Sequence, residues 1–117
     1  MAKIAIEDDQ VVLRLSRAEK VEGLHGDLRA PLSALRGVDV LEDAMGAVHG
    51  MRMPGTGVPG FVAVGTYVDQ GTRTFAVVHH GNPRGVRICF GGADYDDWVI
   101  GCADPDGVAA SLSTPST

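Results

Sequence analysis

The chain has 117 residues, of which 44% are hydrophobic and 21% charged, and this is the size and composition of one globular domain. Ten basic and fifteen acidic residues give a net charge of −5, so the overall field repels nucleic acid and anionic membrane surfaces. The first residues lack the continuous apolar run of a secretory signal, and no segment has the length of a membrane span. We therefore expect a cytoplasmic protein with no nucleic-acid partner and no transmembrane segment.

The first part of the chain predicts a β-hairpin and then a short helix. Apolar residues alternate with polar ones on both sides of the Asp8–Asp9 turn. If Glu7 lies opposite Gln10, the alternating apolar residues share one face; these are Ile4, Ile6, Val11 and Leu13. Residues 16–19 match a capping box, which predicts a helix over 17–22.

The middle of the chain predicts further extended segments and one long loop. Residues 27–42 fit two extended pieces, while 44–48 fit a strand and a helix equally well. Residues 49–60 contain four glycines and two prolines, a composition that regular structure hardly tolerates. We expect this segment to be a long irregular connection.

The remaining sequence predicts a meander of four strands and a C-terminal helix. The strands are expected at 61–68, 73–80, 86–91 and 95–102. Pairing Val68 with Arg73, and Gly91 with Tyr95, places the apolar residues of each hairpin on one face. Asp104 is a good N-cap and the proline after it suits the first helical position, so a helix begins there. The domain is expected to span 1–112, with a flexible tail over 113–117.

Several short motifs carry a resemblance to a known superfold. They are Ser16–Lys20, His25–Arg29, Pro31–Ser33, Pro54–Gly55 and Gly65–Tyr67. With the order of elements, they resemble small uncharacterised bacterial proteins that look like the pleckstrin-homology-like superfold. The resemblance implies a mainly β (α+β) fold: an antiparallel barrel of about seven strands, a short helix after the first hairpin and a C-terminal capping helix. It also implies a non-enzymatic role and carries no catalytic residues.

Lipid-binding members of that superfold place lysines and arginines in the first hairpin turn. The corresponding turn here is Glu7–Gln10, which holds three acids and no base. Acidic side chains repel phosphate groups, so we expect no phosphoinositide binding at this turn.

The sequence gives little support for a metal site or a disulfide. Neighbouring strand residues point to opposite faces, so His79 and His80 cannot chelate one ion. In the predicted register Cys89 and Cys102 also lie on opposite faces, and we expect free thiols. Residues 94–97, with three aspartates, are interpreted as a solvated turn. No metal and no cofactor is predicted.

The leading functional hypothesis is a non-catalytic binding module that uses the 49–60 loop. Methionine and arginine are favoured in interfaces, and functional residues gather on loops. The candidate binding residues are His49, Met51, Arg52, Met53 and Arg84. The partner is expected to be a protein or a small anionic ligand.

Two alternatives stay open. A small enzyme or small-ligand-handling protein would bring His49, Arg52, Arg84 and His80 together around one pocket. A structural subunit would instead show a paired edge strand and a large apolar interface. Catalysis is the weaker expectation, because no Ser-His-Asp arrangement appears in a strand-turn-helix setting. The oligomeric state is left open.

Overall fold

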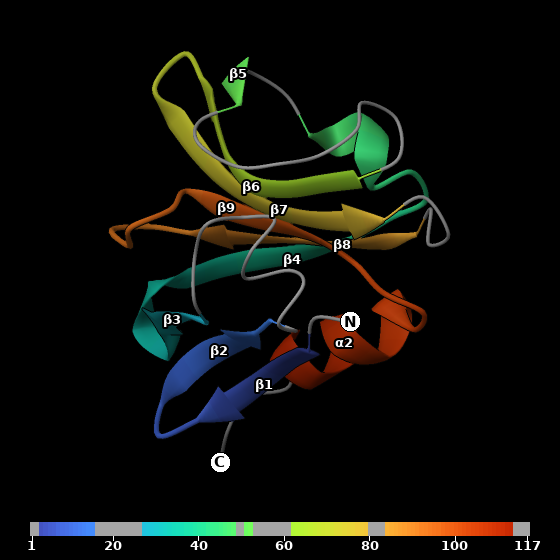
Figure 1. Cartoon of the computed structure of the whole chain (residues 1–117). Helices are drawn as coiled ribbons and strands as arrows, with labels where there is room; N and C mark the ends of the chain where they lie inside the picture. The colour runs from blue at the N-terminus through green and yellow to red at the C-terminus, as the bar shows by residue number, and fades with distance from the viewer. Residues whose placement is uncertain (1–2, 16–26, 49–50, 53–61, 80–83, 114–117) are drawn as a thin grey trace.

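The computed structural model describes residues 3–15, 27–48, 51–52, 62–79 and 84–113. Within these residues the protein is mainly β, with two sheets that form two layers and a C-terminal helix beside the smaller sheet (Figure 1). The expected helix over 17–22 and most of the 49–60 loop lie outside the described residues, as do residues 114–117 of the expected tail.

The small sheet has three antiparallel strands in the order β1-β2-β3. They are β1 (Lys3–Glu7), β2 (Gln10–Arg14) and β3 (Leu28–Pro31). Asp8 and Asp9 both have positive φ, at 50° and 61°, and such a two-residue turn matches the twist of the strands it joins. The predicted register is confirmed, with Ile6 opposite Val11.

The large sheet has the strand order β4-β8-β9-β7-β6-β5, in which β5 is an edge of only two residues. Its strands are β4 (Leu35–Leu41), β5 (Met51–Arg52), β6 (Val62–Asp69), β7 (Thr72–His79), β8 (Gly85–Phe90) and β9 (Asp97–Gly101). Two short 3-10 helices flank β4: η1 (Leu32–Ala34) and η2 (Met45–Ala47). Residues 44–48, which fitted strand and helix equally, thus contain a helical turn.

The predicted four-strand meander is wrong in one respect. Both hairpin registers are confirmed, with Val68 opposite Arg73 and Ile88 opposite Trp98. However, β9 lies between β8 and β7 and pairs with β7 in parallel, while the other neighbour of β8 is β4. All five residues of β9 are buried, and a strand covered on both faces belongs in the middle of a sheet.

The expected antiparallel barrel of about seven strands is not found among the described residues. No strand pairing there joins the small sheet to the large one, so the two remain separate layers. The main core fills the space between them, with Trp98 and Phe75 from the large sheet and Val11 and Leu13 from β2. A second, smaller core lies on the other face of the large sheet and includes Ala76, Val78 and Val99, with Ala44 beside η2.

The C-terminal helix α2 (Pro105–Ser113) is confirmed together with its cap. The backbone N–H of Gly107 donates to Oδ1 of Asp104 at 3.1 Å, which satisfies one of the free amides at the helix start. Leu112 is buried in the main core, and Val108 packs against it. The helix packs on β4 and β8, so it covers the same face of the large sheet as the small sheet does.

Two glycines of the large sheet give a matched test of how closely its elements pack. A Cβ at Gly85 would overlap the carbonyl oxygen of Ile100 on β9, whereas a Cβ at Gly37 meets nothing within 4 Å. We expect Gly85→Ala to lower the free energy of unfolding by about 1–3 kcal/mol, because the neighbouring backbone must shift. Gly37→Ala should change it by less than about 1 kcal/mol. Urea denaturation measures both, and equal effects would contradict the packing.

Candidate functional site

The structure describes only part of the predicted binding residues. His49, Met53 and His80 lie outside the described residues. Met51 and Arg52, expected in an irregular loop, instead form β5, paired with Val68 and Tyr67 of β6. The expectation of no regular structure in 49–60 is therefore wrong for these two residues, because the edge of β6 offers free backbone groups for pairing.

Arg84 is held by two acidic side chains. Its Nε lies 3.1 Å from Oε2 of Glu42 and its Nη2 lies 3.2 Å from Oδ2 of Asp106. The hydrogen bond with Asp106 is the main cause that raises the pKa of Arg84 above its ordinary value. The guanidinium thus links the region after β4 to the first turn of α2. Its charge is already balanced, which leaves it poorly suited to attract an anionic ligand.

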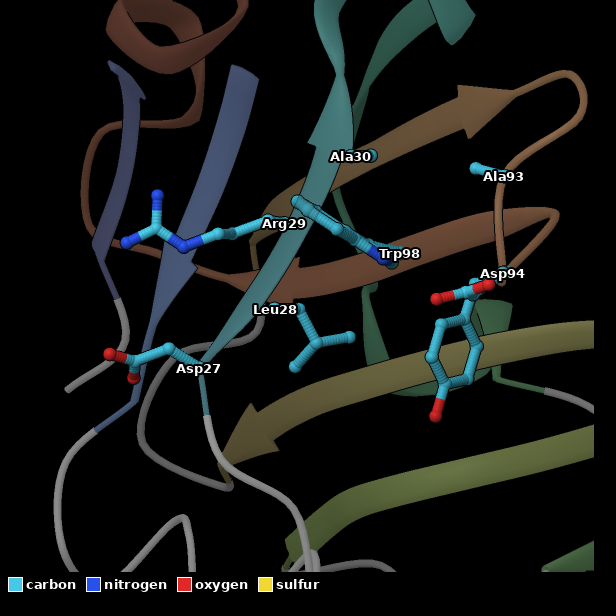
Figure 2. A pocket seen from close by; sticks show the side chains of 8 residues that line it. Asp27, Leu28, Arg29, Ala30, Ala93, Asp94 and Trp98 are labelled. Atoms are coloured by element: carbon cyan, nitrogen blue, oxygen red, sulfur yellow. The ribbon is translucent and has the colours of Figure 1, made fainter. Parts of the chain in front are cut away.

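A small cavity of ≈ 140 Å³ opens between β3 and the turn that joins β8 to β9 (Figure 2). Its floor contains the buried rings of Tyr95 and Trp98. Figure 2 shows Asp27 and Arg29 extending away from Asp94, across the other side of β3. Asp27 accepts a hydrogen bond from a backbone amide at the end of β2, and Arg29 donates to a glutamine of β2. These two charged groups serve the small sheet, and the remaining charged residue of the lining, Asp94, is an acid and does not favour an anionic ligand.

A larger cavity of ≈ 330 Å³ lies on the opposite face of the large sheet, beside η2. Side chains from β4, η2, the β6–β7 turn, β7, β8 and β9 line it. They are Leu41, Ala47, Gln70, Thr72, Thr74, Arg87 and Asp97. The lining thus has an apolar part, from the region of β4 and η2, and a polar part on the sheet. This division is typical of small-ligand sites.

Asp97 is the central group of the polar part. It is the first residue of β9, and only 5% of its side chain is exposed. Thr74 Oγ1 donates to one carboxylate oxygen, and Arg87 Nε donates to the other at 2.8 Å. Register explains the contact, because Asp97 lies directly opposite Thr74 on β7. A buried carboxylate requires such partners, since burial without them costs several kcal/mol.

Arg87 combines a fixed position with an open side. Its side chain is 47% exposed and lines the cavity. The hydrogen bond with Asp97 is the main cause that raises the pKa of the guanidinium, which stays charged. Within the described part of the chain its only hydrogen bond is through Nε, so Nη1 and Nη2 have no partner there. The Nη1–Nη2 edge can bind a carboxylate or phosphate through two parallel hydrogen bonds.

Backbone register extends this row of residues across the sheet. Thr74 lies opposite Tyr67 of β6, and Tyr67 lies opposite Arg52 of β5. Arg52, a predicted binding residue, therefore occupies the outer register position of the row that contains Asp97. Strand β5 thus lies in register with the polar part of the cavity lining.

The sequence analysis did not predict that Asp97 is buried. The interpretation of 94–97 as a solvated turn is wrong at this position, because β9 begins at Asp97 and its carboxylate is covered. The predicted register had already placed Asp97 opposite Cys89, on the face away from Trp98. The sequence did not indicate that this second face is also covered, by the segment around η2.

Cys89 and Cys102 are free thiols in the structure. Cys89 lies opposite Asp97, and burial is the main cause that raises the pKa of its thiol above the ordinary value. Burial likewise raises the pKa of Cys102. The described residues contain no group of three or more His, Cys, Asp or Glu that could hold a metal ion. Their helices also lack the length and apolarity needed to cross a bilayer.

No protein-family model matches this chain, and no curated protein or solved structure shows a significant match to it.

A pair of threonines tests the support of the buried carboxylate. Thr74→Val removes the donor to Asp97, and we expect it to lower the free energy of unfolding by about 1.5–3 kcal/mol, the range for a hydrogen bond to a charged group. Thr72→Val, on the same strand but exposed, should change it by less than about 0.5 kcal/mol. Urea denaturation at neutral pH compares the two variants. Equal stability would show that Asp97 does not depend on this hydroxyl.

The raised thiol pKa values predict slow alkylation. Thiolate is the reactive form, so at mildly alkaline pH both cysteines should react with iodoacetamide more slowly than they do in the urea-unfolded chain. The rate in the folded protein should keep rising as the pH passes above the ordinary thiol pKa, because the folded thiols deprotonate later. Mass spectrometry of each cysteine peptide measures the rates. A folded rate that levels off at a lower pH than the unfolded rate would contradict this prediction.

Proposed function

We propose that this protein is a non-catalytic binding domain for a small anion, a molecule with a carboxylate or phosphate group, held in the cavity beside η2. The observation that carries the proposal is Arg87. Its Nε is fixed on the buried carboxylate of Asp97, while Nη1 and Nη2 have no partner among the described residues. A guanidinium held in this way is ready to bind an anion.

Pre-organisation strengthens this argument. A free arginine side chain loses much rotational freedom when it binds, whereas Arg87 is already restrained by Asp97. Thr72 and Gln70 add a hydroxyl and an amide to the lining, and Leu41 and Ala47 add apolar contact. The volume of ≈ 330 Å³ is at the lower end of the range for ligand sites, about 300–1,000 Å³. The site therefore suits a compact anion with a short carbon part.

The chemistry of the lining favours binding over catalysis. The described residues that line the cavity include no histidine and no cysteine. Cys89, which lies opposite Asp97, has a raised thiol pKa, and this disfavours the nucleophilic thiolate. Asp97 has both carboxylate oxygens engaged, by Thr74 and Arg87, so its role is to support Arg87.

The 49–60 loop belongs to the same proposal. Arg52, within this segment, lies at a register position in the row of Tyr67, Thr74 and Asp97. We propose that the loop supplies further contacts to the bound anion. A protein partner bound through the loop is the second candidate, favoured by the methionines on either side of Arg52.

The pleckstrin-homology-like scaffold stays a prediction. The first hairpin and the C-terminal helix agree with it, whereas the parallel pairing of β7 with β9 departs from a meander. The proposed anion site does not depend on this resemblance.

Isothermal titration calorimetry with inorganic phosphate, a simple phosphomonoester and small mono- and dicarboxylates tests the proposal. We expect saturable binding of at least one probe, and the comparison identifies the anionic group. Arg87→Lys keeps a positive charge beside Asp97 but removes the planar fork, so affinity should fall by roughly 10- to 100-fold.

Arg84→Lys is the matched control, because Arg84 is an exposed arginine that pairs with Glu42 and Asp106 and is not part of the cavity lining. It should bind the probe as the wild type does. Wild-type affinity in Arg87→Lys, or no binding of any probe by the wild type, would overturn the proposal.

A further inference from the structure

Strand β1 forms one edge of the small sheet, and among the described residues its outer side has no strand partner. β1 pairs with β2 on one side only, and no described residue pairs with its other side (Figure 1). The two-residue turn makes Glu7 and Gln10 a hydrogen-bonded pair, so the backbone groups of Ala5 and Lys3 also face β2. The N–H and C=O groups of Ile4 and Ile6 must therefore face outward. Such an edge is a template for another strand.

The side chains of this edge are also incompletely covered. Ile6 is 40% exposed and is the exposed large hydrophobic residue of the described part. A groove of ≈ 320 Å³ lies between β1 and α2, lined among others by Ile4, Ile6, Val108 and Leu112. Exposed apolar surface beside an open strand edge is costly in water and is typical of an interface.

Lys3 has an unfavourable environment in the single chain. It lies opposite Arg14 on β2, and like charges directly opposite each other destabilise a sheet. Arg14 is engaged by Glu7, with Nη2 2.6 Å from Oε1. Within the described residues Lys3 itself forms no ion pair. The described part of the chain thus offers the ammonium group no acidic partner within ion-pair distance.

We propose that β1 pairs antiparallel with β1 of a second copy of this chain, with Ala5 on the two-fold axis. In this register Lys3 of each copy lies opposite Glu7 of the other, and Ile4 lies opposite Ile6. The outward backbone groups belong to Ile4 and Ile6, so Ile4 of one copy and Ile6 of the other form a hydrogen-bonded pair. Lys3 and Glu7 then form the non-hydrogen-bonded pairs, in which side chains approach most closely.

One register therefore brings together charge, apolar surface and backbone. Lys3 comes to lie beside Glu7 of the second copy, a carboxylate that Arg14 of that copy also contacts, so acid and base alternate across the new strand pair. The isoleucines of the second copy extend the apolar face beside the groove between β1 and α2. The small side chain of Ala5 permits close approach on the axis. The two three-stranded sheets become one continuous sheet across both copies. This contact is self-complementary, as a two-fold dimer requires.

Charge reversal tests this register directly. We expect the wild type to show a concentration-dependent monomer–dimer equilibrium in analytical ultracentrifugation. Lys3→Glu places two acids opposite each other at both ends of the paired strands, and Glu7→Lys places two bases there. Each single variant should weaken the dimer by roughly tenfold or more in dissociation constant.

The two single variants should dimerise with each other when mixed, because both cross-strand pairs are then of opposite charge. The double variant Lys3→Glu/Glu7→Lys should regain the wild-type dissociation constant. Far-ultraviolet circular dichroism and melting temperature identify variants that fail to fold, and the mixing experiment still tests the register with the folded ones. A monomeric wild type, wild-type dimerisation of both single variants, or no association of the mixture would overturn the proposal.

Discussion

The complete burial of β9 is the constraint on which the rest of the structure depends. This strand lies between β7 and β8, and all five of its residues are covered. Trp98 and Ile100 belong to the main core, while Val99 belongs to the smaller core on the other face. Asp97 begins the strand, so its carboxylate is covered as well and requires Thr74 and Arg87. The proposed anion site is therefore a direct result of where β9 lies.

The local parts of the fold could be predicted from the sequence, and the placement of β9 could not. Alternation of apolar residues was sufficient for three hairpin registers, since a shift of one residue would move every apolar side chain to the wrong face. The alternation of apolar residues does not specify which other strand lies beside a hairpin in the sheet. Trp98 and Ile100 fit the core whether β9 is central or at an edge, so the parallel pairing with β7 left no sign in the periodicity.

The same limit explains what was missed at the candidate site. Predicting Asp97 as a buried group required knowledge that η2 and the segment before it cover the second face of the sheet. Those residues, 44–48, gave no clear periodicity of their own. Arg84 and Arg87 have the same residue type, but only the structure distinguishes them. Two surface acids form ion pairs with Arg84. The buried Asp97 fixes Nε of Arg87, and Asp39 lies opposite Arg87 on β4, yet no described residue forms a hydrogen bond with Nη1 or Nη2 of Arg87.

The strand order of the large sheet has a consequence for how the chain folds. The first hairpin and the β6–β7 hairpin form from neighbouring segments, so little loop-closure entropy opposes them. β4, in contrast, must find β8 across all of β5, β6 and β7, and β9 must find β7 across β8. Such pairings raise the contact order and slow the folding of small domains. The hairpin of β8 and β9 is also local, so the slow steps are those that set this hairpin between β4 and β7 and thereby cover both faces of β9.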